Sequence, residues 1–124
     1  MIKKRSRHSI LIEANIQVSA LKEIGWGNYK GIQYNTRLSF VVNGLHYIGV
    51  VVECDGVITP GKSGVVVFLT ASDALLETDV DAGSIVELSG GSRTVATAEI
   101  LSMKRVFVKH APNEKCGYII RELP

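Results

Sequence analysis

Apolar and polar residues alternate at every second position near the start of the chain. From Ile10 to Val18, apolar residues at the even positions are separated by Glu13, Asn15 and Gln17. A period of two with one polar face is typical of a half-buried antiparallel strand. The pattern therefore predicts a first strand over residues 10–18.

More strands are expected at short intervals along the chain. The Asn43-Gly44 dipeptide favours a two-residue hairpin turn between strands at 38–42 and 45–54. VVVFLT at 65–70 is continuously apolar and β-branched, which predicts a central strand. Other strands are expected at 84–88 and 93–101, on either side of an SGGS turn at 89–92, and at 105–110 and 117–123, which form a last hairpin.

One segment alone favours a helical turn. SDALLE at 72–77 has helix-forming residues, and Ser72 or Asp73 can serve as its cap. No longer segment repeats its apolar residues with the 3.6-residue period of a helix. Short strands separated by glycine-rich turns predict an all-β barrel or sandwich.

Length and composition fit one cytoplasmic domain. The chain has 124 residues, 46% of them hydrophobic, and a net charge of only +2 from 14 basic and 12 acidic side chains. That balance gives no indication of nucleic-acid or membrane binding. No apolar run approaches a membrane span or a secretory signal. Cys54 and Cys116 lack metal or redox spacing, so we expect free thiols in a reducing cytoplasm.

GVITPGKS at 56–63 fits the pattern of a nucleotide-binding phosphate loop, G-x-x-x-x-G-K-[ST]. Such a loop works because a helix N-terminus follows it and directs free N–H groups at the phosphates. Here Ser63 is followed by GVVVFLTA, which predicts a strand. We therefore expect no nucleotide binding, and a turn with Pro60 and Gly61 at its corner.

The segments around this turn carry a family resemblance. ITPGKSGVVVFL resembles V-x-P-G-x-x-x-x-x-x-V-x-L, and GSIVELSGGSRTVATAEIL at 83–101 resembles G-x-x-F-x-I-R-E-G-G-R-T-V-G-x-G-x-V. IEANIQVSALKE and YNTRLSF match upstream strands in the same order. Over roughly residues 10–106 the chain is similar to the C-terminal barrel, the third domain, of bacterial elongation factor Tu. The direct matches in the second segment are Gly83, Gly91, Arg93, Thr94 and Val95.

The resemblance implies a six-stranded Greek-key closed barrel over residues 10–106. A basic tail at 1–9 precedes it, and a C-terminal hairpin or extension at 107–124 follows it. Small barrels use glycines and bulges to bend their strands, because a Cβ restricts the backbone angles. We expect that role for Gly83, Gly90 and Gly91, and we expect Arg93 to donate hydrogen bonds to carbonyls left unpaired at the adjacent turn.

The resemblance does not bring GTPase activity, because the GTPase domain of that factor has no counterpart here. The family barrel contacts the T-arm of tRNA and also binds proteins. Its R-E-G-G turn is S-G-G-S at 89–92 here, and its R-P-Q is N-T-R at 35–37. We therefore expect a non-catalytic protein-binding module, such as an immunity or inhibitor protein that caps a toxin or enzyme. The alternative is a module that binds a tRNA-like RNA helix.

Catalytic and metal patterns are weak. None of the histidines, His8, His46 and His110, has a His, Cys or Asp at ligand spacing. ETDVDAG at 77–83 spaces its acids like a calcium loop, but it lacks glycine at the sixth loop position and has Leu88 at the twelfth. We expect a solvated acidic loop, no metal, no cofactor and no enzymatic activity.

Two surfaces are candidate binding sites. GWGNYKGIQYNTR at 25–37 suits base stacking or a protein interface, or else its tryptophan closes one barrel end. The predicted partner-binding residues there are Trp26, Tyr29, Lys30, Tyr34 and Arg37. The basic ends are the second surface, which the antiparallel fold unites into one RNA-binding patch unless the N-terminal run is a solvated tail. Its residues are Lys3, Lys4, Arg5, Arg7, Lys104, Arg105 and Lys109.

Overall fold

The computed structural model describes residues 6–114 and 117–122. This part of the chain is built almost entirely of antiparallel strands. The strands are β1 (Ser6–Val18), β2 (Arg37–Val42), β3 (Leu45–Cys54), β4 (Ser63–Thr70), β5 (Ile85–Gly90), β6 (Arg93–His110) and β7 (Tyr118–Glu122). The helical segments are α1 (Leu21–Ile24) and the 3₁₀ turn η1 (Ala74–Glu77).

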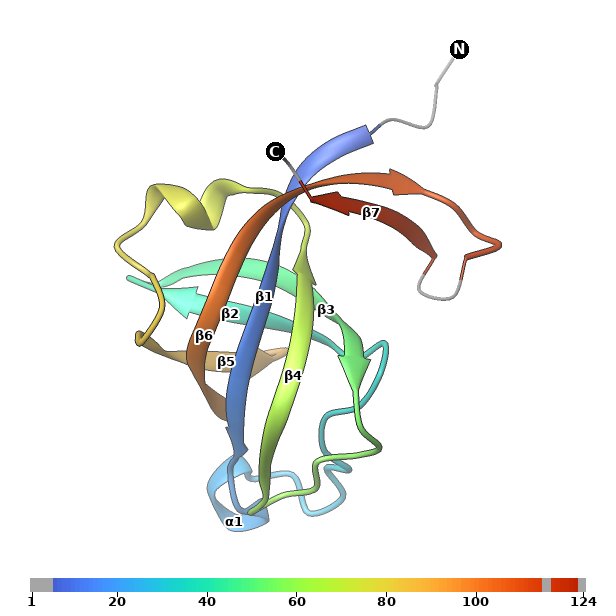
Figure 1. Ribbon diagram of the computed structural model, residues 1–124. Coiled ribbons are helices and arrows are strands. Elements are labelled where there is room, and N and C mark those ends of the chain that lie inside the picture. The colour runs from blue at the N-terminus through green and yellow to red at the C-terminus, as the bar shows by residue number, and fades with distance from the viewer. Residues whose placement is uncertain (1–5, 115–116, 123–124) are drawn as a thin grey trace.

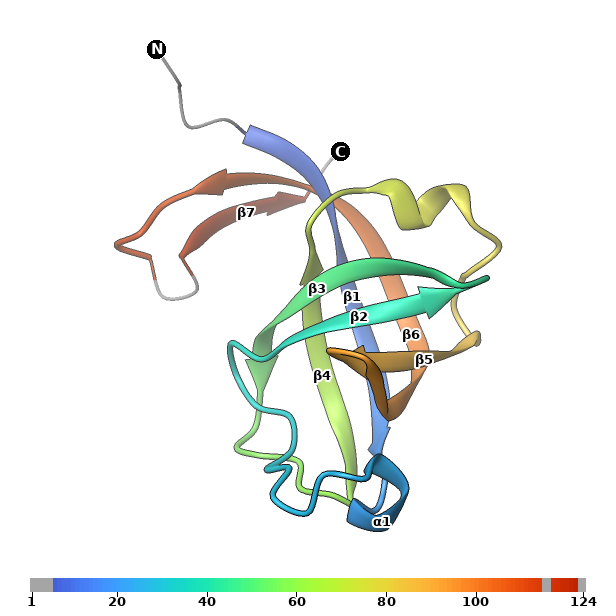
Figure 2. The ribbon, with the colours of Figure 1, turned by 180° about the vertical axis from the view of Figure 1, so that it is seen from behind.

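Six strands close into a barrel in the order β1-β4-β3-β2-β5-β6, and pairing between β1 and β6 completes the ring. Figures 1 and 2 show β6, β1 and β4 on one wall and β2, β3 and β5 on the other. β1 lies beside β4 and reaches β2 through the long connection at 19–36, which is a Greek-key arrangement. β7 pairs with β6 outside the ring. The predicted six-stranded barrel with an extra C-terminal hairpin is confirmed.

The period-two pattern of the first strand places one face in the core. Ile10, Ile12 and Ile16 are fully buried, whereas Glu13 and Asn15 between them are exposed. β4 lies between β1 and β3, so its prediction as a central strand is also confirmed. At the centre, apolar side chains from the two walls meet, because a small barrel is filled by its inward side chains.

The turns form where glycine, asparagine and proline predict them. Asn43 and Gly44 both have positive φ, as a two-residue hairpin turn requires. At the phosphate-loop-like segment, Lys62 N–H donates to the Thr59 carbonyl at 3.0 Å, and Gly61 has a φ of +84°. β4 begins at Ser63, so a strand follows this turn and the predicted proline-glycine corner is confirmed.

The helical segments are short. The turn expected within residues 72–77 forms as η1, and the Ser72 hydroxyl accepts a hydrogen bond from the Ala74 N–H at 3.3 Å. Leu75 of η1 is buried against the barrel core. No helix in residues 6–114 and 117–122 has the length and apolar character needed to cross a membrane.

Two strand boundaries differ from the prediction. β1 begins at Ser6, inside the expected tail, because residues 6–9 pair with 106–109 of β6. β6 runs unbroken from Arg93 to His110, across the expected gap at 102–104 and the barrel boundary at 106. The register shift in the β1–β6 ladder leaves Leu101 as an extra residue in β6, and such a bulge bends a strand without ending it.

Candidate functional site

Trp26 helps to close one end of the barrel. The β1–β2 connection crosses that end, and Trp26 within it is half-buried and packs against the main core. The Trp26 ring lies close to the β5–β6 turn, because its Cη2 would be 3.7 Å from a Cβ placed on Gly91. Gly91 has a φ of +67°, whereas Gly90 lies within β5 without positive φ. This position favours the structural role for Trp26 over an exposed interface anchor.

Arg93 stacks on the Trp26 ring. Its guanidinium lies 5.1 Å from the centroid of the Trp26 ring, and Nη1 donates a hydrogen bond to the Ile24 carbonyl at 3.1 Å. Ile24 is the last residue of α1, where carbonyls lack partners within the helix. Arg93 was expected to bond carbonyls of its own turn, and it instead joins that turn to α1.

Tyr29 lies beside the tryptophan. Its ring centroid is 6.0 Å from that of Trp26, and its hydroxyl is buried with no hydrogen-bond partner among the described residues. Burial raises the pKa of the Tyr29 phenol above its ordinary value. These contacts indicate that Trp26 and Tyr29 form one packed unit under the loop.

The other predicted partner-binding residues lie elsewhere. Tyr34 and Arg37 line a groove of about 180 Å³, together with His110 and Tyr118 from the β6–β7 hairpin. Lys30 is exposed and lines neither the groove nor the barrel end. The set predicted from the loop is thus divided between the barrel end and this groove, and Lys30 belongs to neither.

The basic ends meet only in part. Arg7 pairs with Val108 in the β1–β6 ladder, so the first and last basic segments are neighbours. The Arg7 guanidinium lies 5.2 Å from the centroid of the Tyr118 ring, and its Nε donates to the Ala71 carbonyl at 3.0 Å. Arg7 therefore joins the hairpin to the barrel. The predicted RNA-binding residues Lys3, Lys4 and Arg5 lie outside the described residues.

Two of the remaining cations have acidic partners. Lys104 forms an ion pair with Glu122 at 2.9 Å, and Arg105 forms one with Asp73 at 3.0 Å. Both pairs are exposed, so each adds little stability. Lys109 makes no ion pair within the described residues. Of the predicted basic patch in this part of the chain, Lys109 alone has a charge that no ion pair or aromatic ring engages.

The ends of β1, β6 and β7 form a small sheet outside the ring, which we call the extension: residues 6–9, 106–110 and 118–122. Its inner face packs on the outer wall of the barrel, with Val106 and Val108 fully buried beside Leu69 of β4. Tyr118 and Ile120 pack against the same cluster. This second core fixes the extension to the barrel.

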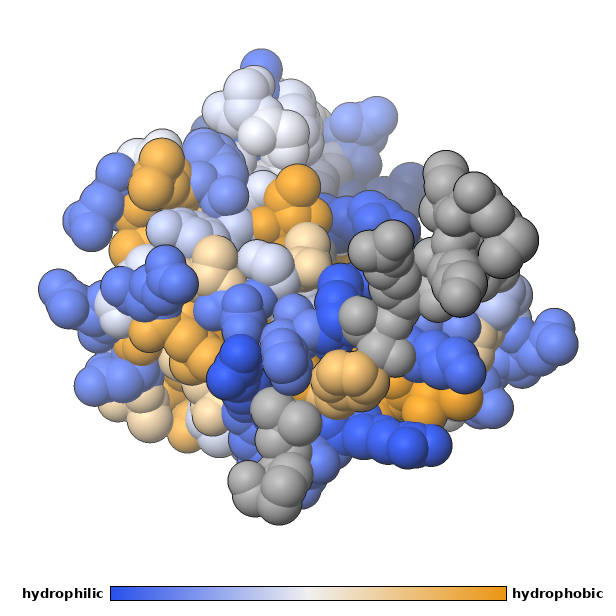
Figure 3. Space-filling model, turned by 90° about the horizontal axis from the view of Figure 1, so that it is seen from above, coloured by the Kyte–Doolittle hydropathy of each residue, from blue (hydrophilic) through white to orange (hydrophobic). Residues whose placement is uncertain are grey.

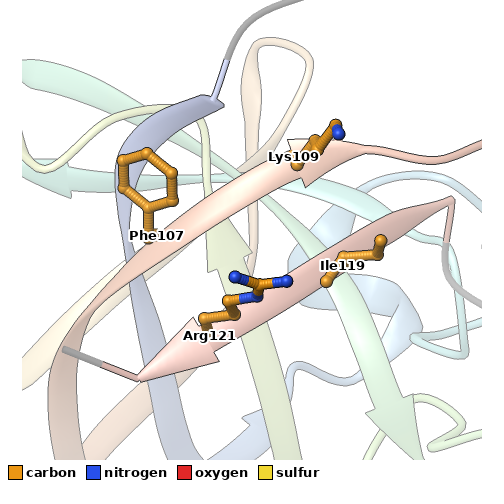
Figure 4. A pocket seen from close by; sticks show the side chains of 4 residues that line it. All are labelled: Phe107, Lys109, Ile119 and Arg121. Atoms are coloured by element: carbon orange, nitrogen blue, oxygen red, sulfur yellow. The ribbon is translucent and has the colours of Figure 1, made fainter.

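The opposite side of the extension, which we call the outer hairpin face, is formed by Phe107, Lys109, Ile119 and Arg121. These residues line a concavity of about 230 Å³ (Figure 4). The cross-strand pairs are Lys109 with Ile119 and Phe107 with Arg121. Figure 4 shows the Arg121 side chain extending towards β6.

Cations and apolar groups alternate on this face. Lys109 and Arg121 are exposed and make no ion pair with a described residue, and Ile119 is 37% exposed. His8 packs edge-on against Phe107, with ring centroids 5.4 Å apart. Viewed from above, this end of the molecule shows apolar patches among hydrophilic ones (Figure 3).

The sequence prediction included only Lys109 of these four residues. A signal for the others was present, because RVFVKH and GYIIREL alternate and each places every second side chain on one face. The missing information was the pairing register of the two strands, which brings Arg121 opposite Phe107.

β7 leaves an open strand edge. It pairs with β6 on one side and with no other strand among the described residues. The Ala111 N–H donates to the Gly117 carbonyl at 2.9 Å, which sets the alternation of hydrogen-bonded pairs along the hairpin. By that alternation Ile119 bonds to β6, and the N–H and C=O of Ile120 point away from it. Ile120 therefore presents backbone hydrogen-bonding groups at the open edge.

Metal and thiol chemistry have little support in residues 6–114 and 117–122. These residues contain no group of three or more His, Cys, Asp or Glu side chains placed to hold a metal. Burial, and then the nearby Asp55 carboxylate, raise the pKa of the half-buried Cys54 thiol. A raised pKa disfavours the thiolate, which is the nucleophilic form.

The comparisons with known proteins do not assign a family. No protein-family model matches the chain, and a search of curated proteins finds no significant match.

Proposed function

We propose that this protein is a non-catalytic binding module, in which the closed barrel is the scaffold and the extension binds another protein. The observation that carries the proposal is the open edge of β7, attached outside a closed ring in which each of the six strands has two neighbours. Within the extension, residues 6–9 of β1 also pair on one side only, with β6. A closed ring leaves no strand edge at which a partner can pair, whereas β7 outside the ring offers one. The outer hairpin face beside that edge supplies apolar contacts and positive charge.

A protein partner fits this surface better than RNA does. A strand edge offers backbone donors and acceptors that match another polypeptide. RNA binding depends on cations that contact many phosphates. Arg7 in the extension and Arg105 beside it are already engaged by Tyr118 and Asp73, which leaves Lys109 and Arg121 among the described residues of the extension. Two cations are few for following an RNA backbone.

Kinship with the elongation-factor barrel remains part of the proposal. It is supported by the six-stranded ring and by positive φ at Gly83 and Gly91, two of the matched glycines. One concrete form is an immunity or inhibitor protein that caps a toxin or enzyme through the extension. In that form the module acts by covering a surface and needs no catalytic group of its own.

Partner capture with matched charge-reversal variants tests the proposal. The tagged protein is used to capture partners from a lysate of the organism that encodes it, with and without nuclease. Arg121→Glu alters the outer hairpin face. Lys62→Glu makes the same charge change on the exposed turn before β4, where the Lys62 carbonyl accepts a hydrogen bond from Val18 at the end of β1 away from the extension.

We expect to capture a protein that stays bound after nuclease treatment. The Lys62→Glu variant should capture the same protein, and the Arg121→Glu variant should not. Capture that disappears with nuclease would instead support the RNA alternative. Capture that both variants retain equally would remove the extension from the interface. Thermal melts of each variant show whether the barrel remains folded.

A further inference from the structure

We infer that the partner supplies an extended acidic segment, which pairs with β7 as an additional strand of the extension. An acidic side chain of that segment lies beside Arg121, and an apolar side chain two positions away lies beside Ile119. This inference rests on the proposed function and specifies the chemistry of its partner.

The backbone of β7 provides the first argument. Ile120 directs its N–H and C=O to the open edge. Glu122, two residues further on, directs its backbone groups the same way. An incoming strand can pair with these groups, whereas a ligand without a peptide backbone cannot match their alternation. The second core, between the extension and the barrel, keeps β7 in place, because Ile120 packs against its cluster of Leu69, Val106 and Val108. The edge is therefore preorganised.

The side chains provide the second argument. In a β-sheet, side chains on one face recur at every second residue, so a strand added to β7 has neighbours at Ile119 and Arg121 on the outer hairpin face. Arg121 has no ion pair with a described residue, and Lys109 lies across the hairpin from Ile119. Both charges are positive, so an acidic side chain at this place gains attraction. The expected ligand pattern is an acidic and an apolar residue separated by one position.

The same charges disfavour a second copy of this chain as the occupant. Pairing of β7 with β7 would bring two sets of Lys109 and Arg121 together on one sheet. Cationic side chains on edge strands are a common device against such self-pairing. The outer hairpin face thus repels a second copy of this chain and attracts an acidic strand.

Selection from a random dodecapeptide phage library tests the ligand pattern. The wild-type chain is expected to enrich peptides in which an acidic residue and an apolar residue are two positions apart. Arg121→Glu is expected to lose this preference and to enrich basic peptides, whereas Lys62→Glu should keep the acidic pattern. No enrichment, or the same peptides with all three proteins, would overturn the inference.

A backbone substitution tests the pairing itself. A peptide covering residues 116–124 can be joined to the rest of the chain by native ligation at Cys116, with or without an N-methyl group on Ile120. The methyl group removes the outward N–H and leaves every side chain unchanged. We expect about a tenfold weaker Kd for a fluorescein-labelled selected peptide, measured by anisotropy. An unchanged Kd would exclude strand addition at this edge.

The outcomes separate this inference from the proposed function. In one outcome, nuclease-resistant capture is abolished by Arg121→Glu, but the N-methyl variant binds the peptide with an unchanged Kd. That result would support the binding module and reject the added strand. Preference for a uridine decanucleotide over the selected peptide would reject both. Sedimentation of the free chain checks for a dimer, and a dimer that the peptide dissociates would assign β7 to a second copy instead.

Discussion

The guanidinium of Arg93 lies 5.1 Å from the centre of the Trp26 ring and also bonds to the last carbonyl of α1. One side chain therefore connects the β5–β6 turn, the β1–β2 connection and the short helix. This relationship makes the tryptophan a part of the barrel end, and it moves the expected binding surface to the extension on the far side of the molecule (Figure 1).

Replacing Arg93 by glutamine should loosen the barrel end. The variant loses the stacking on Trp26 and the charged hydrogen bond to Ile24, so we expect the free energy of unfolding to fall by about 1 kcal/mol. Trp26 fluorescence should shift to the red as water reaches the ring. Arg37→Gln is the control, because Arg37 contacts the groove beside His110 and should leave the tryptophan spectrum unchanged.

Truncating the tryptophan separates packing from binding. We expect Trp26→Ala to lower the free energy of unfolding by about 2 kcal/mol, less than for a fully buried side chain because the ring is half-buried. Trp26→Phe should recover part of the loss. Capture of the partner by the folded fraction should be unchanged. A stable Trp26→Ala protein that no longer captured its partner would restore Trp26 as an interface anchor.

The turn between β5 and β6 offers a matched pair of glycines. Gly91 has a φ of +67°, and an alanine there should cost about 1–2 kcal/mol through backbone strain. Gly90 has no positive φ, and a Cβ on it would meet Leu38 and Val95 at an ordinary 3.5 Å. Gly90→Ala should therefore change stability by less than about 0.5 kcal/mol. Chemical denaturation measures both, and equal effects would contradict the assigned turn.

The buried hydroxyl of Tyr29 should be dispensable. It has no described partner, so Tyr29→Phe is expected to raise the free energy of unfolding by about 1 kcal/mol at neutral pH. Burial raises the phenol pKa above 10.0, so the unfolded chain releases this proton first as the pH rises. The native protein should lose stability above pH 10 relative to the phenylalanine variant. Parallel stability curves for the two proteins between pH 9 and 11 would show that the hydroxyl is solvated or bonded.

The sequence predicted most of the barrel because its strands are defined locally. Alternation identified the buried face of β1, and Asn43-Gly44 identified the β2–β3 turn through its backbone angles. The valines after Ser63 predicted a strand in place of the helix that a phosphate loop needs, and β4 begins there. These features depend on neighbours within a few residues.

The extension was harder to predict because it depends on pairings between distant segments. Residues 102–104 fall in a gap between two predicted strands, but they lie within β6 and pair with residues 11–13 of β1. Residues 6–9 have the composition of a solvated tail until their pairing with 106–109 is known. The predicted partner-binding residues around Trp26 are divided for the same reason. Tyr34 lies in the groove beside His110, a residue distant in the sequence.

Amide hydrogen exchange of the complex with the captured partner, compared with the free protein, tests the central claim most directly. If the partner binds at the open edge of the extension, the amides of Ile120 and Glu122 should become strongly protected, while exchange in residues 26–31 stays the same. Protection confined to residues 26–31, with the β7 amides unchanged, would contradict the account and place the interface at the barrel end.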